Sequence, residues 1–154
     1  MALKGDHRIL VDDVSFFMNE VSNRGSVVSF STAGSGAALD QSAALVTVAA
    51  TASGKVPVGV LLCDMVNIDQ TRQHLNQHKF EVQKGGKVRI GNHGWIVTDQ
   101  IASGITAGVG DKAYLANGGR ITNVNTGAAA SPPVGRFLST PDEDGYAKVY
   151  VQLP

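Results

Sequence analysis

Two histidines between residues 67 and 80 have a spacing that suits metal binding. His74 and His78 are four residues apart, so on a helix they would share one face and could chelate a metal ion. A zinc-protease pair carries a glutamate directly after its first histidine, and Leu75 occupies that position here. The segment has neither a clean helical nor a clean strand period, and we expect a long loop or extended segment held by polar contacts. We therefore predict no metal site.

A second candidate is a glycine pattern that matches a nucleotide-binding fingerprint. Gly108, Gly110 and Ala113 fit the pattern G-x-G-x-x-A, which binds phosphate only when a helix begins immediately after it. Residues 114–116 lead directly into Asn117-Gly118-Gly119, which leaves no room for that helix. Gly34-Ser35-Gly36 fits neither a P-loop nor a nucleophile elbow. Both segments are predicted to be turns, and no cofactor is expected.

The remaining candidates are an acidic triplet and the single cysteine. Asp142, Glu143 and Asp144 are consecutive, whereas a calcium loop of the EF type uses alternate acidic positions, so a turn ending at Gly145 is the better interpretation. Cys63 closes an apolar run and has no histidine or cation beside it, which favours a small buried side chain. No segment combines a nucleophile, a base and an orienting group. We predict that the chain is not an enzyme.

Composition excludes several classes of protein. The 154 residues contain 13 basic and 13 acidic side chains, so the chain lacks the positive charge of a dedicated nucleic-acid-binding protein. One cysteine cannot form an internal disulfide. The apolar run from Val56 to Cys63 is too short to cross a bilayer, and the first six residues do not resemble a signal peptide. We expect synthesis in the cytoplasm, with neither a membrane nor a nucleic acid as partner.

One segment has a helical period, and the rest of the chain has strand patterns. Val14, Phe17, Met18 and Val21 follow an i, i+3, i+4, i+7 spacing, which predicts an amphipathic helix over residues 13–22. Strands are predicted at residues 27–30, 45–48, 58–62, 87–90, 95–97, 113–116, 120–123 and 147–151. The run 58–62 suits a strand buried on both faces. Asn92-His93-Gly94 and Asn117-Gly118-Gly119 are predicted to be the turns of two β-hairpins.

These elements predict two parts of unequal size. Residues 1–25 would form an N-terminal arm with one short helix, and residues 26–154 a single mainly β domain. Its fold class is a small β-barrel or sandwich. Residues 33–38 and 127–133 are expected to be exposed loops, since they have neither period nor bulky side chains.

Two blocks of sequence resemble a known family. The first comprises FMNEV (17–21), RG (24–25) and STAGSGAA (31–38). The second comprises VGVL (58–61), DMVN (64–67), TRQH (71–74), GGKV (85–88), GDKAYL (110–115), VGRFLS (134–139) and DEDGY (142–146). From about residue 8 onward, the pattern resembles the head decoration, or cement, proteins of tailed bacteriophages.

The resemblance implies a non-enzymatic protein of the virion with a β-tulip-like fold. Such proteins are often homotrimers that sit on the outer capsid surface, bridge major capsid subunits and stabilise the head against internal pressure. The N-terminal segment would then pack on capsid protein or on a neighbouring protomer, although a helix that plugs its own barrel is an equally good interpretation. The expected contact residues are Ile9, Val14, Phe16, Phe17, Met18 and Val21.

Two other classes of protein remain as alternatives. One is a tail-tube or head–tail connector subunit of a virion, although the sparse charge argues against a ring with a charged lumen. The other is a trimeric β-fold enzyme, such as a nucleotide hydrolase, which would need carboxylates like Asp64, Asp69 and Asp99 to bind metal or act as a base. A thermal shift caused by nucleotide would favour this enzyme.

Overall fold

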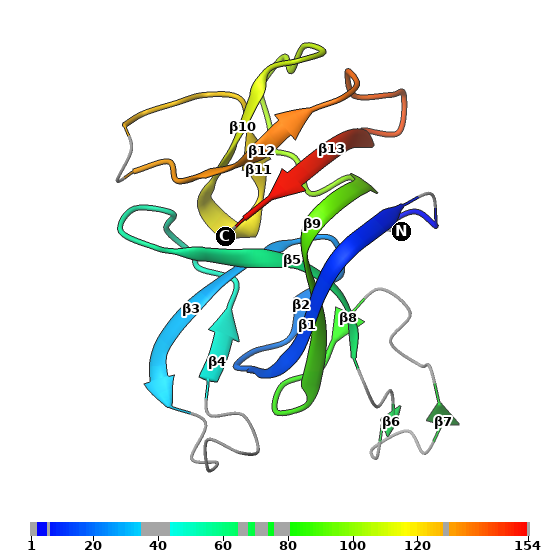
Figure 1. Ribbon diagram of the computed structural model, residues 1–154, viewed down its shortest axis with the longest axis vertical. Helices are drawn as coiled ribbons and strands as arrows, with labels where there is room; N and C mark the ends of the chain where they lie inside the picture. The colour runs from blue at the N-terminus through cyan, green and yellow to red at the C-terminus, as the bar shows by residue number, and fades with distance from the viewer. Residues whose placement is uncertain are drawn as a thin grey trace.

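A computed structural model describes residues 3–5, 7–34, 44–64, 68–69, 74–75, 81–127 and 130–153. The fold is mainly β (Figure 1). The strands are β1 (Arg8–Met18), β2 (Ser22–Asn23), β3 (Val27–Gly34), β4 (Ala44–Thr47), β5 (Pro57–Asp64), β6 (Ile68–Asp69), β7 (His74–Leu75), β8 (Glu81–Val82), β9 (Lys87–Thr98), β10 (Lys112–Leu115), β11 (Ile121–Thr122), β12 (Pro133–Phe137) and β13 (Ala147–Gln152). Within these ranges the helical structure is one 3-10 turn, Asn117–Gly119.

Nine of the strands form one mixed sheet, in the order β1-β4-β3-β5-β9-β13-β12-β10-β11. The long strand β9 also pairs with β1, so hydrogen bonds link β1, β4, β3, β5 and β9 in a ring. The remaining strands of this sheet, β13, β12, β10 and β11, continue from β9 on the other side of the ring (Figure 1). Strand β9 therefore belongs to both halves of the sheet.

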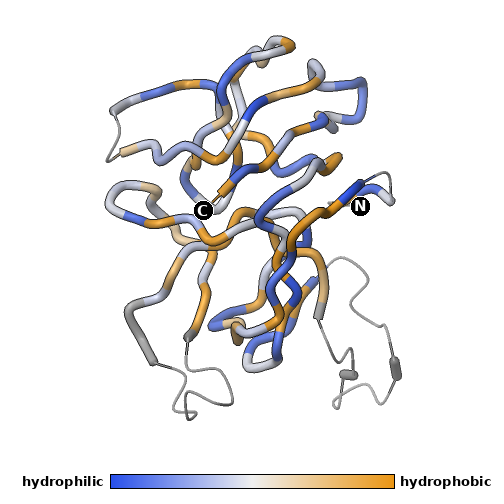
Figure 2. Tube along the Cα trace, viewed as in Figure 1, coloured by the Kyte–Doolittle hydropathy of each residue, from blue (hydrophilic) through white to orange (hydrophobic). Residues whose placement is uncertain are grey.

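The sheet encloses two hydrophobic cores. The lower core is lined by the ring of five strands and consists of Met18, Val28, Val46, Val58, Leu61, Val82, Val88 and Ile90. The upper core lies beneath β13, β12 and β10, and its large members are Val27, Val60, Leu62, Ile96, Leu115, Ile121, Val134, Phe137, Val149 and Val151. Hydrophobic stretches recur along β4 and β5 in Figure 2.

Strand β5 separates the two cores, and from Val60 to Leu62 its side chains alternate between them with the period of two that is typical of strands. Val60 and Leu62 belong to the upper core, whereas Val58 and Leu61 belong to the lower one. All four side chains are buried, which confirms the prediction that this apolar run is a strand covered on both faces. Neighbouring β3 divides in the same way between Val27 and Val28.

The helix predicted over residues 13–22 is wrong. Residues up to Met18 belong to β1, and β2 begins at Ser22. A β-bulge between Asp13 and Phe16 explains the misleading period, because the extra residue shifts the alternation of the side chains that follow. A short helix gains little by itself, whereas strand pairing satisfies the backbone and buries Met18.

The first of the two predicted hairpins is also wrong. Strand β9 runs without a turn through Asn92-His93-Gly94, and His93 pairs with Gln152 of β13. Gly94 has a φ of 146°, and a Cβ there would lie 2.1 Å from the carbonyl oxygen of Arg8. The glycine thus allows β1 to approach closely instead of reversing the chain. The second hairpin is confirmed, because β10 pairs with β11 across Asn117–Gly119.

The other strand predictions are confirmed in β3, β4, β5, β9, β10, β11 and β13, with boundaries that differ by a few residues. Most of the predicted loop at 33–38 lies outside the described residues, as do 128–129 of the loop at 127–133. The described part of 67–80 consists of the paired strands β6 and β7. Among the helices of the described chain, none has the length and apolar character needed to span a membrane.

Candidate interaction surface

Two of the predicted contact residues lie in the interior. Met18, at the end of β1, is completely buried in the lower core. Ile9, near the start of the strand, is partly buried and packs against the upper core, where its side chain fills the space over Gly91. Both side chains therefore stabilise the fold, and neither offers a free surface for a partner.

The two phenylalanines of β1 are half-buried. Phe16 packs against the lower core, and its ring makes an edge-to-face contact with Phe30 of β3 at a centroid distance of 5.7 Å. Phe17 lies on the other face of the strand, where the Nζ atom of Lys87 is 5.6 Å from its ring centroid. Phe16 thus closes the edge of its own core, while Phe17 is covered by a neighbouring side chain.

Val14 and Val21 are the predicted contact residues that the structure leaves exposed, with 43% and 54% of their surface accessible. Strand β1 also exposes Leu10 and Val11, at 51% and 52%. The sequence analysis missed these two because it placed the apolar stripe on a helix that began after them. Reading residues 8–18 as a strand would have included both.

One edge of β1 is available along most of its length. Strand β9 pairs with residues from Arg8 to Phe17, but β4 pairs only with Phe16, Phe17 and Met18. Within the described chain, no strand pairs with the second edge of residues 8–15. Leu10, Val11 and Val14 therefore combine exposed apolar side chains with a free strand edge, and we call residues 8–15 the β1 edge.

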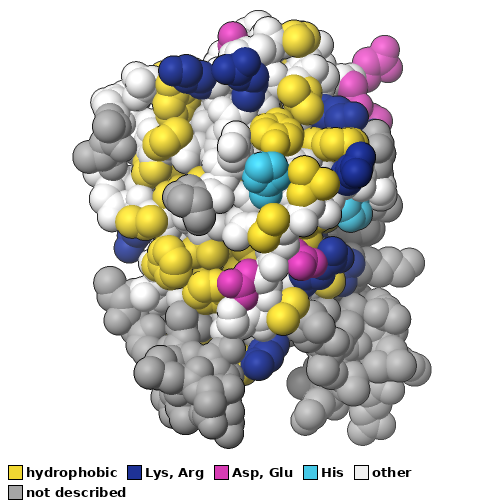
Figure 3. All heavy atoms as spheres, in the orientation of Figure 1, with side chains coloured by type: hydrophobic (Ala, Val, Ile, Leu, Met, Phe, Trp, Pro, Cys, Tyr) yellow, Lys and Arg dark blue, Asp and Glu magenta, His cyan; other side chains and the backbone are white. Residues whose placement is uncertain are grey.

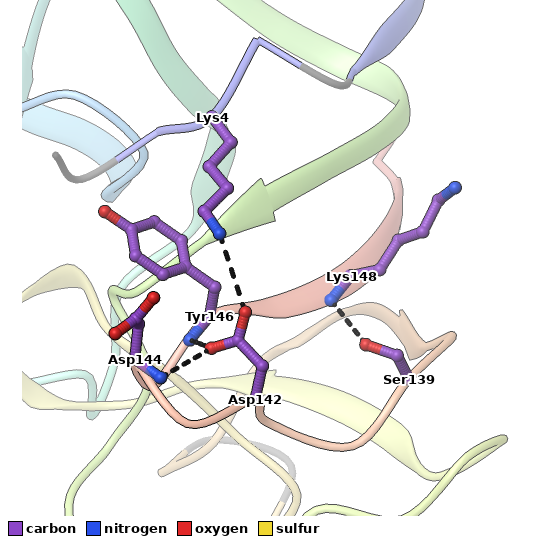
Figure 4. A network of polar contacts seen from close by, with 6 residues as sticks. All are labelled: Lys4, Ser139, Asp142, Asp144, Tyr146 and Lys148. Atoms are coloured by element: carbon purple, nitrogen blue, oxygen red, sulfur yellow. Dashed lines mark hydrogen bonds and ion pairs between the residues drawn. The ribbon is translucent and has the colours of Figure 1, made fainter.

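The residues before β1 are fixed to the end of β9 and to the turn that precedes β13. The backbone N–H of Lys4 donates to the carbonyl of Val97 at 2.9 Å, and its Nζ atom lies 3.5 Å from a carboxylate oxygen of Asp142 (Figure 4). Asp142 also accepts hydrogen bonds from the backbone N–H groups of Tyr146 and Asp144. The bond from Tyr146, more than the others, lowers the pKa of Asp142. The acidic triplet is thus a turn, as predicted.

Among the described residues, those considered for chemistry lie in separate parts of the fold. The Gly108 segment is a turn followed by strand β10, with Asp111 accepting bonds from Asn123 and the backbone of Gly108, and these bonds lower the pKa of Asp111. His74 lies in β7, while its proposed partner His78 is outside the described residues. Among the described side chains, no three of His, Cys, Asp or Glu cluster as metal ligands.

The carboxylates considered for a β-fold enzyme are only partly described. Asp99 accepts a hydrogen bond from the side chain of Gln100. Asp64 and Asp69 lie in β5 and β6, and their side chains are outside the described structure. Cys63 is half-buried near the end of β5, so its expected full burial is only partly observed.

Comparison of the sequence with models of protein families and with curated proteins found no match.

Proposed function

We propose that this chain is a non-enzymatic structural protein of a bacteriophage virion. It binds the outer surface of the capsid, bridges major capsid subunits and stabilises the head. The proposal starts from the sequence resemblance to decoration proteins, and the observation that carries it is the exposed, apolar β1 edge. We further propose that the ring of five strands is a small β-tulip-like barrel, and that the protein is made in the host cytoplasm and assembles as a homotrimer.

The β1 edge suits attachment to a shell of protein subunits. Free N–H and C=O groups along a strand can pair with a strand of a partner, which extends the sheet across the interface. Leu10, Val11 and Val14, which are each about half exposed, would lose water in the same step, and burying the rest of each side chain contributes on the order of 1 kcal/mol. The net charge of zero also fits recognition by shape and backbone pairing more than by long-range attraction.

Co-sedimentation with mature phage heads that lack the protein tests this proposal. We expect saturable binding at a fixed ratio to the capsid subunit, and a mass in free solution that corresponds to three chains. Absence of binding in mild salt would contradict the proposed function. A binding ratio that varies without limit would contradict it too, because it indicates nonspecific adsorption.

A pair of variants tests the role of the β1 edge. The double substitution Leu10→Ser and Val11→Ser should weaken binding to heads by at least about tenfold, because it removes two apolar contacts. Val109→Ser is the matched control, since Val109 is 71% exposed in a turn away from β1. Equal binding by both variants would exclude the β1 edge while leaving the capsid proposal intact.

A further inference from the structure

A row of cationic and aromatic side chains crosses five strands on the outer face of the sheet. Cross-strand partners point to the same face of a sheet. The register pairs Arg8 of β1 with Trp95 of β9, Trp95 with Tyr150 of β13, Tyr150 with Arg136 of β12, and Arg136 with Lys112 of β10. We call these five residues the cationic row. Residues far apart in the sequence thus form one continuous line on the surface.

The opposite face of the same strands confirms that the row points outward. Ile96, Val149 and Phe137 alternate with row residues along β9, β13 and β12, and all three are buried in the upper core. Arg8, Arg136 and Lys112 are exposed. On the face shown in Figure 3, Lys and Arg side chains border a group of hydrophobic side chains.

Two cations on this face, Arg8 of the row and the adjacent Lys148, lie over the ring of Trp95. The guanidinium of Arg8 and the ammonium of Lys148, next to the row, lie 5.8 Å and 5.1 Å from the ring centroid of Trp95. The Lys148 side chain extends away from Asp142 (Figure 4). Within the described chain, none of Arg8, Lys112, Arg136 and Lys148 forms an ion pair. Among the described residues, these four positive charges therefore share one face with no carboxylate in ion-pair contact.

A surface hollow adjoins the row on β12 and β13. It has a volume of about 550 Å³, and its lining includes Lys112, Arg136 and Tyr150 but no acidic residue. The carboxylate of Asp111, next to Lys112 in the sequence, already accepts a hydrogen bond from Asn123. An anionic group from outside is therefore the ligand that complements this hollow.

We infer that the cationic row is a docking face for an acidic segment of a partner protein, with carboxylates as the recognised groups. Four intervals between strands span about 19 Å, a length that an extended peptide of about six residues covers. Arginine binds carboxylates through two parallel hydrogen bonds, so Arg8 and Arg136 supply specificity while Lys112 and Lys148 add charge. The inference goes beyond the proposed function, because capsid attachment through the exposed apolar residues of the β1 edge, which shares only Arg8 with the row, does not require this face.

The aromatic residues of the row favour a protein segment over nucleic acid. Binding to single strands uses aromatic rings with a free face on which bases stack. The Trp95 ring is already in contact with two cations. Tyr150 makes an edge-to-face contact with His93, and its hydroxyl lies 2.7 Å from the Nε2 atom of the same residue. The two rings are thus engaged within the molecule, Trp95 with two cations and Tyr150 with His93.

Trp95 is the one tryptophan in the sequence, so its fluorescence reports binding at the row, between Arg8 and Tyr150. We would titrate the full chain with a hexaglutamate peptide with blocked ends, and with hexaglutamine and a ten-nucleotide oligothymidine for comparison. Hexaglutamate should change the emission saturably at low ionic strength and lose affinity in 0.5 M salt, because exposed charges are then screened. Hexaglutamine should cause no change.

Charge reversal in the row provides the decisive comparison. Arg136→Glu should weaken hexaglutamate binding by at least about tenfold, while Arg120→Glu, an exposed arginine outside the row, should change it less than about twofold. Lys112→Glu repeats the test on β10 if Arg136→Glu lowers the melting temperature. The inference is overturned if hexaglutamate does not bind, if both arginine variants weaken it equally, or if oligothymidine binds more tightly. None of these outcomes bears on binding of the wild-type protein to phage heads.

Discussion

At the scale of single residues, glycines without a Cβ atom allow neighbouring strands to approach each other closely. A Cβ at Gly94 would lie 2.1 Å from the Arg8 carbonyl oxygen, and one at Gly135 would lie 1.8 Å from the Tyr150 carbonyl oxygen. These glycines let β1 approach β9 and β12 approach β13, which are the pairings that align Arg8, Trp95, Tyr150 and Arg136 in the cationic row. Gly94 and Gly135 therefore determine the arrangement of the cationic row, although neither belongs to it.

Replacing Gly94 with alanine should destabilise the protein by at least about 2 kcal/mol, because the new methyl group overlaps β1 and the backbone has a positive φ. Gly86→Ala is the control, since nothing lies within 4 Å of its added Cβ and its φ is ordinary. Urea unfolding measures both. Equal stabilities for the two variants would contradict the observed approach of β1 to Gly94.

Asp142 predicts a dependence of stability on acid. Its pKa is lowered in the folded state, first by the hydrogen bond from Tyr146, so its ionised form contributes stability above the ordinary pKa near 4 and loses it as pH falls through the lower folded value. Asp142→Asn should therefore be less stable than wild type at pH 7, and the difference should shrink as the pH falls below the ordinary aspartate pKa. Urea unfolding at several pH values measures this difference.

Glu143→Gln is the control for Asp142, because it removes an exposed charge from the same turn. Its stability should remain close to that of wild type at pH 7. A difference between Asp142→Asn and wild type that stays constant down to pH 2 would show that the carboxylate charge does not matter.

At the scale of elements, sequence patterns predicted strands where one periodic signal dominated. The apolar run of β5 and the turn between β10 and β11 are both correct. Strand β1 was mistaken for a helix because its bulge shifts the period, and β9 was divided in two because a glycine that permits close approach resembles one that permits a turn. Both errors involve the pairing of β1 with β9, which joins residues about 80 positions apart and leaves no local signal.

The same limit applies to the candidate surfaces. The apolar character of the N-terminal segment was visible in the sequence, and Val14 and Val21 are exposed as a contact role requires. The cationic row could not be predicted, because Arg8 and Lys112 share a face only through the register of five strands. Net charge conceals it as well, since the whole chain is neutral.

Phe16 separates a structural from a binding role for β1. Its contacts with Phe30 and the lower core predict that Phe16→Ser lowers the free energy of unfolding by about 1–3 kcal/mol, less than for a fully buried ring. Binding to phage heads, measured at a temperature where the variant is folded, should decrease less than for the Leu10→Ser and Val11→Ser double variant. Loss of affinity at unchanged stability would instead place Phe16 in the interface.

At the scale of the whole molecule, the two cores share their strands. Strands β3 and β5 each contribute side chains to both cores. Strand β9 contributes Val88 and Ile90 to the lower core and Ile96 to the upper one. If one core unfolds, the shared strands lose the packing on one of their faces. The other core, which is built on the same strands, is then destabilised as well. The β1 edge and the cationic row both include residues of β1, so the shared framework also holds the two surfaces in a fixed relation.

Shared strands predict a single cooperative unfolding transition. Leu61→Ala in the lower core should cost about 2–5 kcal/mol, and Phe137→Ala in the upper core about 3–5 kcal/mol, because each leaves a cavity around a fully buried site. Calorimetry should show one peak for wild type and for each variant, with equal calorimetric and van't Hoff enthalpies. Each kcal/mol should lower the melting temperature by about 2–4 °C, whichever core is altered. Two peaks, one shifted by each substitution, would mean that the cores unfold separately and that β3, β5 and β9 do not couple them.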